Sequence, residues 1–370
     1  MNTLGRRAAP ELLLWPPRAT RRVYQAAMIQ SRRFTVSTIL TPPLVFTGLL
    51  VSLWTYKCLM MVIFQNKIIY MPSVPPFSRN ETIEDYTKQC GGITWKEERI
   101  KASDGVDIAL AVASVDGIKD EVKKEASHIA IVYCQGNGGA LPPRLPSLSM
   151  VLKALHREAS SSTRFTLVAV SYRGYWTSRG RPSERGISYD AAAAVEYTMT
   201  KLRRPTDPPI KLVLWGQSIG AGVATSAAAA LSSVTRKKEG GRDGASTLAS
   251  PVSGLLLETP FVSVRAMLTE IYPQKWLPYR YLGPFLRNHW DSRAALRKIA
   301  NPVTSSSKIL ILQAGQDELV PGGQGVQLED SCRDLRLDVQ RIVVSSALHN
   351  EVAAKGQGRR AIVDFLHGFG

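Results

Sequence analysis

Short apolar runs alternate with helical patterns along residues 81–370, and this alternation restricts the fold more than any other feature of the sequence. The runs are almost continuously apolar, which is typical of strands that are buried on both faces. Such strands, separated by helices, predict a mainly parallel α/β sheet covered by helices on both sides, in one larger domain. The expected parallel strands are residues 129–133, 166–170, 211–215, 254–257, 308–312 and 337–344.

The rest of this domain follows from the same patterns. Runs at 93–101 and 106–115 flank Ser103-Asp104-Gly105 and predict an antiparallel hairpin at the start of the sheet. The polar, Gly/Ser-rich residues 233–252 predict a loop insertion. The aromatic, proline-broken residues 265–300 stand where a small cap would cover a site, although ordinary packing explains them equally well. Helices are expected at 144–157, 189–202, 219–232 and 358–367.

A 21-residue apolar stretch, residues 44–64, precedes the domain. As a helix it reaches roughly 31 Å, the thickness of the hydrocarbon core of a bilayer. Lys57 opposes insertion by roughly 2.5–3.5 kcal/mol, but each Leu, Val, Ile and Phe favours it by about 0.3–0.6 kcal/mol, and the lysine can snorkel. We expect a transmembrane anchor at 44–64, preceded by a basic tail over 1–43, rather than a buried core helix.

The charge around this stretch predicts its orientation. Residues 1–34 contain seven arginines and no lysine, whereas Lys67 and Arg79 follow the stretch. The excess places the N-terminus in the cytoplasm, which is a type II topology. The sequon Asn80-Glu81-Thr82 agrees with a lumenal domain and favours the endoplasmic reticulum or another endomembrane. An Arg-rich, acid-poor N-terminus is also typical of mitochondrial targeting, which remains the alternative.

Charge and cysteine content argue against several other classes of protein. The net charge is +17, but +9 of it belongs to residues 1–80, and no recognition fold is interleaved with the arginines, so no nucleic-acid partner is expected. The four cysteines form neither a CxxC nor a Cys/His cluster. We therefore expect no metal and no cofactor.

Gly216-Gln217-Ser218-Ile219-Gly220 is a GxSxG motif between an expected strand and an expected helix. A tight strand-to-helix turn forces the serine into a strained backbone, and the two glycines remove side chains that would collide. The hydroxyl of Ser218 then projects above the sheet near a helix N-terminus. This context makes Ser218 the candidate nucleophile.

A serine needs a base and an acid to become a nucleophile, in the chain order serine, acid, histidine for this kind of fold. Asp317 follows the strand at 308–312, and His349 follows the strand that ends at Val344. Of the five histidines, His349 alone satisfies both order and location. We expect Ser218, His349 and Asp317 to form a catalytic triad. The oxyanion hole should use the backbone N–H groups of Ile219 and of Asn137, unless the loop 135–139 is a plain glycine-rich turn.

These motifs resemble the α/β-hydrolase superfamily, in particular the membrane-anchored bud-emergence-type hydrolases of fungi and their single-pass relatives in animals and plants. The likeness covers about residue 60 to the end and rests on seven blocks in the same order: YCQGNGG, YRGYWTSRGRPSERG, WGQSIGAGVA, ETPFVSV, HWDS, GQDELVP and LHNE. The resemblance implies the α/β-hydrolase fold and a serine hydrolase, among whose relatives are protein depalmitoylating thioesterases and lipid esterases.

Two residues depart from the family pattern. Gln135 stands where a histidine is usual, which affects how Asn137 is positioned, and Trp176 stands where a glycine is common, where it either narrows the mouth of the site or packs against the cap. The function expected from the sequence is hydrolysis of a carboxylic ester or thioester of a lipid or acyl-protein. The alternatives are an inactive scaffold in cell polarity or morphogenesis, and a serine peptidase on the same fold.

Overall fold

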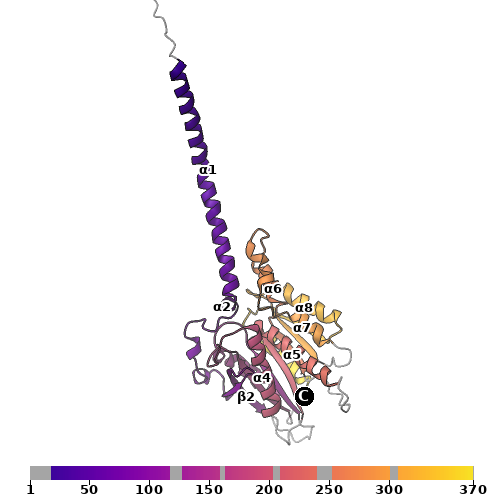
Figure 1. The fold of residues 1–370 in the computed structure, drawn as a ribbon. Coiled ribbons are helices and arrows are strands. Elements are labelled where there is room, and N and C mark those ends of the chain that lie inside the picture. The colour runs from indigo at the N-terminus through magenta and orange to yellow at the C-terminus, as the bar shows by residue number, and fades with distance from the viewer. Residues whose placement is uncertain are drawn as a thin grey trace, which may run out of the picture. The chain divides into compact units, whose positions relative to one another are not determined.

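The computed structural model describes residues 18–116, 127–158, 163–202, 209–239, 252–300 and 307–369. The chain divides into two compact units, residues 1–60 and residues 61–370. Figure 1 shows the course of the chain, with the N-terminal helix in indigo.

An eight-stranded sheet forms the centre of the second unit, with the strand order β1-β2-β4-β3-β5-β6-β7-β8. β1 and β2 form an antiparallel hairpin, β2 also pairs antiparallel with β4, and all later pairs are parallel. This is the α/β-hydrolase fold that the sequence predicts. The strands are β1 (Lys96–Lys101), β2 (Asp107–Asp116), β3 (Ser127–Cys134), β4 (Thr163–Ser171), β5 (Ile210–Gln217), β6 (Val252–Glu258), β7 (Lys308–Ala314) and β8 (Val339–Val344).

Helices cover both faces of this sheet. α3 (Leu145–Glu158) and α9 (Gly356–His367) contribute buried side chains to one apolar cluster. α4 (Glu184–Lys201), α5 (Ile219–Glu239), α7 (Ser292–Ile299) and α8 (Gly323–Asp334) contribute to a second cluster. Successive residues of β3 alternate between the two, since Ile131 and Tyr133 belong to the first cluster and Val132 and Cys134 to the second. Two buried faces explain why the strands read as continuous apolar runs.

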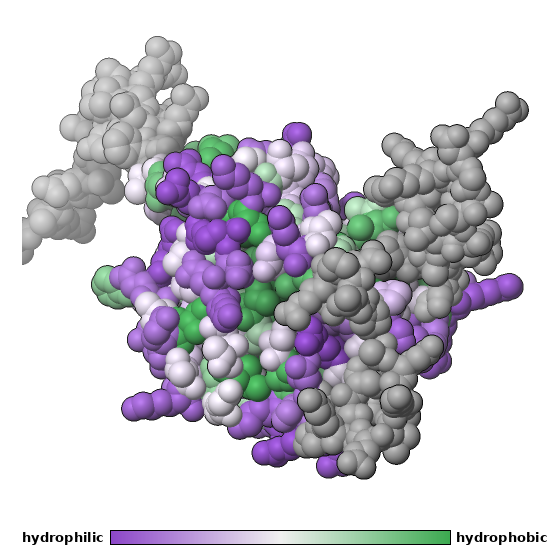
Figure 2. Space-filling model, turned by 90° about the horizontal axis from the view of Figure 1, so that it is seen from below, coloured by the Kyte–Doolittle hydropathy of each residue, from purple (hydrophilic) through white to green (hydrophobic). Residues whose placement is uncertain are grey.

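The remaining helices are short and lie between the larger elements. The face of the molecule in Figure 2 is mostly hydrophilic, with hydrophobic residues in smaller patches. These helices are α2 (Gln65–Ile69), α6 (Val264–Ile271) and the 3-10 turns η1 (Ser78–Asn80), η2 (Glu84–Tyr86), η3 (Pro142–Arg144), η4 (Pro278–Tyr281) and η5 (Gly283–Phe285).

The first unit consists of most of α1 (Arg18–Ile63), which contains Pro42 and Pro43. Within α1, Thr38–Ile63 is long and apolar enough to cross a bilayer, with a mean hydropathy of 1.6 over its most apolar window, none of which is buried in the protein. α1 begins at Arg18, so residues 18–43 of the expected tail are helical. Residues 18–30 are rich in Arg, Ala, Gln and Met, which have high helix propensities.

The loop expected over 233–252 also differs in its first part. α5 continues to Glu239, because residues 234–239 contain no helix breaker and Gly240-Gly241 follow only after it. Residues 240–251 lie outside the described residues.

Candidate active site

Ser218 occupies a sharp turn between β5 and α5 and has a left-handed backbone, with φ 54°. Such a φ is strained for a residue other than glycine. A Cβ atom at Gly216 would lie 2.1 Å from the carbonyl oxygen of Gly220, and a Cβ atom at Gly220 would lie 2.0 Å from that of Cys134. Both glycines of the motif are therefore required for the turn, for the reason that the sequence suggested.

His349 and Asp317 form a buried pair. The Nδ1 atom of His349 lies 2.9 Å from both carboxylate oxygens of Asp317, and the two side chains are 3% and 4% exposed. They meet because each follows a strand of the parallel pair β7 and β8, whose carboxyl ends share one edge of the sheet. The acid and the histidine that the sequence order selects thus lie side by side.

The carboxylate of Asp317 also accepts hydrogen bonds from the backbone. The backbone N–H groups of Leu319 and Val320 donate to its Oδ1 at 3.0 Å and 2.7 Å. Burial raises the pKa of Asp317, but the bonds from His349 and from these N–H groups lower it further, so the pKa ends below its usual value. Asp317 is consequently an anion at neutral pH, as a partner for a histidine cation must be.

Ser218 shares a cavity with the loop of the acid. Leu319 and Val320, which bind Asp317, line the same cavity as Ser218. The structure describes both Ser218 and His349, and it shows no hydrogen bond between the Ser218 hydroxyl and His349. Catalytic bonds of this kind are often long before substrate binds and tighten afterwards.

Asn137 and Ile219, the expected oxyanion donors, line this cavity together with Ser218. The side-chain oxygen of Asn137 accepts hydrogen bonds from the backbone N–H of Met71 at 3.0 Å and from the hydroxyl of Tyr175 at 3.0 Å. These contacts fix the loop without any help from residue 135. The side chain of Gln135 is buried, and its amide has no hydrogen-bond partner among the described residues.

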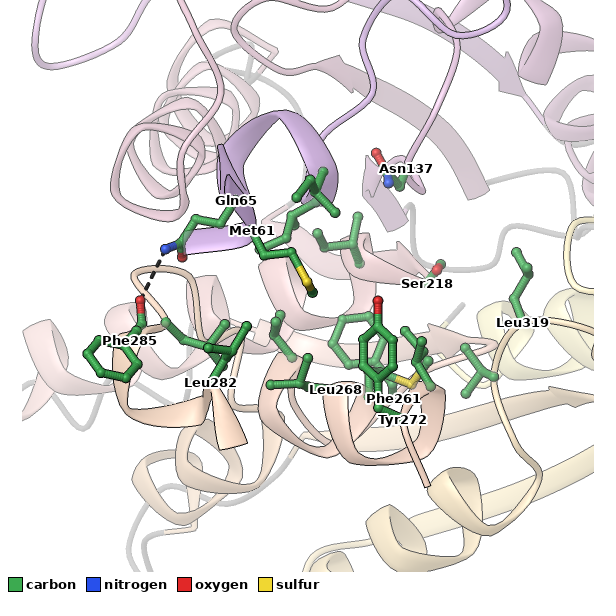
Figure 3. Close-up of a pocket in the computed structure, with 18 of the residues that line it drawn as sticks. Met61, Gln65, Asn137, Ser218, Phe261, Leu268, Tyr272, Leu282, Phe285 and Leu319 are labelled. Carbon is green, nitrogen blue, oxygen red and sulfur yellow. Dashed lines mark hydrogen bonds between the residues drawn. The ribbon is translucent and has the colours of Figure 1, made fainter. Parts of the chain in front are cut away.

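The cavity at Ser218 has a volume of about 310 Å³ and is lined mostly by apolar side chains. Figure 3 shows Ser218 and Asn137 at one end of it and Leu282 and Phe285 at the other. α6 supplies one wall through Leu268 and its neighbours, so residues of the expected cap segment 265–300 do face the site. We call this space the apolar cavity.

Part of the wall comes from residues 61–69, which no sequence motif connects with the site. Met61, Val62, Gln65, Ile68 and Ile69 line the apolar cavity. The amide of Gln65 donates to the carbonyl oxygen of Phe285 at 3.1 Å and accepts from the backbone N–H of Arg287. A contact across more than 200 residues leaves no local signal in the sequence, because the segment reads only as the end of an apolar stretch.

Trp176 plays neither of the roles expected for it. Its indole is 2% exposed and packs in the apolar cluster that includes Ile83 and Trp95. Its Nε1 donates to the carbonyl oxygen of Glu81 at 2.7 Å, and its own backbone is left-handed, with φ 42°. This bond and this packing hold the ring away from the apolar cavity, so Trp176 narrows no mouth and contacts no cap residue there.

The wound sheet and the strained serine turn define a hydrolase of the α/β type. A sequence model described as the alpha/beta hydrolase family matches residues 138–349, more than half of the chain, and the protein belongs to this family. It is 28% identical over 240 residues to Protein bem46 of Schizosaccharomyces pombe, covering 65% of this chain and 68% of that protein. The resemblance to bud-emergence-type hydrolases is therefore confirmed.

Two further comparisons agree with this family. The chain is 30% identical over 259 residues to "Lysophosphatidylserine lipase ABHD12" of Danio rerio, covering 65% of this chain and 59% of that protein. Among solved structures, an alpha-beta hydrolase from Vibrio vulnificus is similar in fold, with a TM-score of 0.58 and 17% identity over 81% of this chain and 92% of that one.

Proposed function

We propose that the protein is a membrane-anchored serine hydrolase that cleaves carboxylic esters or thioesters of acyl chains through Ser218, His349 and Asp317. One observation carries the proposal: a strained serine lies in an apolar cavity whose wall includes the loop that holds a buried histidine–aspartate pair. A structural serine has no need of such a backbone, whereas a nucleophile that must project from a turn does.

The chemistry divides among these residues. Ser218 attacks the acyl carbonyl while His349 accepts its proton, and Asp317 orients the imidazole and stabilises its charged form. The backbone N–H groups of Ile219 and Asn137 bind the oxyanion. His349 then protonates the leaving alcohol or thiol, and a water molecule, deprotonated by His349, releases the acyl group from Ser218. No step calls for a metal or a cofactor.

An acyl chain is the ligand that suits the apolar cavity. Each methylene group that the cavity buries contributes about 0.8 kcal/mol. The relative from Danio rerio is named a lipase, which supports a lipid ester as substrate. A thioester of an acylated protein presents the same acyl carbonyl and remains in the proposal.

The membrane to which the expected anchor attaches the protein is the proposed source of this substrate. Met61 and Val62 belong both to the candidate span and to the wall of the apolar cavity. If residues 44–64 cross the membrane, the lipids of that membrane are the acyl esters that the protein meets at highest concentration. We propose a type II orientation in the endoplasmic reticulum or another endomembrane, with a mitochondrial membrane as the alternative.

Labelling by a fluorophosphonate probe tests the proposal on the full chain in detergent micelles. We expect labelling of the protein and of Ser188→Ala, an exposed serine of α4, and no labelling of Ser218→Ala. Profiling with acyl esters, acyl thioesters and peptides then identifies the leaving group. If the wild-type protein is not labelled, or if Ser218→Ala is labelled as strongly as the wild type, the result would support the inactive scaffold. Turnover of peptides alone would support the peptidase.

A further inference from the structure

A second and larger cavity lies beside the serine turn. It has a volume of about 710 Å³ and is lined by polar residues that the mechanism above does not use, including Arg144, Gln217, Glu258 and Asn350. We call it the polar cavity. Its position relates it to the same reaction centre, because Asn137 lines both cavities and because Gln217 and Ser218 are consecutive residues, one in each.

Arg144 is the charged group that distinguishes the polar cavity. Its Nη1 atom donates to the amide oxygen of Gln217 at 2.6 Å and approaches that of Asn350 at 3.5 Å. Among the described residues no carboxylate lies within ion-pair distance of it, and Nε and Nη2 donate to none of them. A guanidinium has five donors in a planar fork, so most of its capacity is unused here.

The carboxylates that line the polar cavity are bound elsewhere. Glu258 is buried and accepts hydrogen bonds from the indole of Trp215 at 2.9 Å and from the backbone N–H of Ala353 at 3.2 Å. Burial raises the pKa of Glu258, which favours its neutral form. Glu81 accepts a hydrogen bond from the hydroxyl of Tyr86 at 3.2 Å. Neither compensates the charge of Arg144 by direct contact.

Room for a ligand lies beside Arg144, because this side chain itself lines the polar cavity. Gly138 and Gly139 of the loop 135–139 line the same cavity, and neither has a side chain that would fill the space. Phosphate and carboxylate groups match the fork of an arginine in two parallel hydrogen bonds.

We propose that the polar cavity binds an anionic group, phosphate or carboxylate, on the leaving-group side of the substrate, with Arg144 as its direct contact. The inference rests on the proposed function, because it assigns the acyl chain to the apolar cavity and the ester carbonyl to the point where the two cavities meet. The enzyme then selects esters by the charge of the alcohol that is released, which the apolar cavity alone cannot do.

Two substrates that share the bond to be broken test this proposal. 1-Dodecanoylglycerol and its 3-phosphate are offered to the full-length protein in mixed micelles of a nonionic detergent, and the ratio of the two kcat/KM values is measured. We expect the phosphate to be favoured by tenfold or more. Arg144→Gln should reduce the ratio by about that factor, and Arg144→Lys, which keeps the charge but loses the fork, should reduce it less.

A matched control is Arg179→Gln, since the side chain of Arg179 is 82% exposed and lies outside both cavities. This variant should keep the ratio. An equal loss with both substrates in Arg144→Gln would overturn the proposal, because it would make Arg144 a support for Gln217 only. A ratio near one in the wild-type protein would overturn it as well.

Two further arms keep the outcome decisive. In the first, inorganic phosphate is tested as an inhibitor of neutral-ester hydrolysis. If it inhibits the wild type but not Arg144→Gln, and the substrate ratio is the same in both proteins, the polar cavity binds a free anion and the leaving-group site is refuted. If Ser218 reacts with the fluorophosphonate but neither ester is turned over, protection of Ser218 by each lipid replaces kcat/KM, with the same expected ratio. Absence of Ser218-dependent labelling would instead be the failure of the proposed function itself.

Discussion

Replacement of Asp317 by asparagine separates a catalytic role of the buried pair from a structural one. The amide keeps the shape of the carboxylate, and its oxygen can still accept the N–H groups of Leu319 and Val320, which donate at 3.0 Å and 2.7 Å. The substitution therefore removes a charge and leaves the loop intact. What it removes from catalysis is the stabilisation of the histidine cation that forms in the transition state.

The magnitude follows from the geometry of the pair. Both oxygens of Asp317 lie 2.9 Å from Nδ1 of His349, so the centres of the two charged groups are about 4 Å apart, which at an effective dielectric constant near 20 gives about 4 kcal/mol. That energy corresponds to a factor of about 10³ in rate. Loss of the favoured tautomer adds to it, and the same exchange in a well-studied serine protease triad costs about 10⁴. We expect kcat/KM of Asp317→Asn to fall by about 10³–10⁴.

Steady-state hydrolysis of a p-nitrophenyl acyl ester in detergent measures this loss. Asp334→Asn, an exposed aspartate at the end of α8, is the matched control and should retain wild-type kcat/KM. Thermal unfolding of both variants verifies that they are folded. A folded Asp317→Asn with less than a tenfold loss would refute the role of Asp317 beside His349, provided that Ser218→Ala is inactive in the same assay.

Three further outcomes are expected. Gly220→Ala should lower the free energy of unfolding by several kcal/mol, because its Cβ would lie 2.0 Å from a carbonyl oxygen; thermal unfolding checks this against Gly323→Ala, which has open space around it, and equal stability of the two would contradict the geometry. Leu268→Trp should shift the preferred acyl chain toward shorter lengths, by about fourfold in kcat/KM for each methylene excluded; an unchanged series of ester lengths would argue against an acyl chain in the apolar cavity. If the domain is lumenal, glycosidase treatment should shift the mobility of the protein from cells but not that of Asn80→Gln, whereas an unshifted wild type would remove the support that the sequon gives to that topology.

The fold could be predicted from the sequence because the sheet is buried on both faces. Runs such as 129–133 are continuously apolar, and neighbouring residues of β3 do pack in opposite clusters. Elements with weaker patterns were harder. α8 (Gly323–Asp334) was not expected, since it contains Gly323 and Gly325 and many polar residues, and its existence depends on packing rather than on helix propensity.

The site was predicted as far as local rules reach. The turn at Ser218 follows from two glycines at fixed spacing, and the meeting of Asp317 with His349 follows from the position of both residues after parallel strands. The two cavities follow from neither. A hydrogen bond to the carbonyl oxygen of Phe285 positions Gln65 in the wall of the apolar cavity, and a hydrogen bond to Gln217 positions Arg144 in the wall of the polar cavity. The periodicity of the sequence encodes neither contact.

The last residues of the candidate span, 61–63, belong to the compact unit that contains the site. Met61 and Val62 form part of the wall of the apolar cavity, and Arg287 donates to the carbonyl oxygens of Val62 and Ile63 at 3.0 Å and 2.9 Å. Those two carbonyl groups lie at the end of a helix, where they lack partners within it. A shift of the helix end would therefore alter the cavity directly, so the geometry of the cavity depends on the same few residues that end the candidate span.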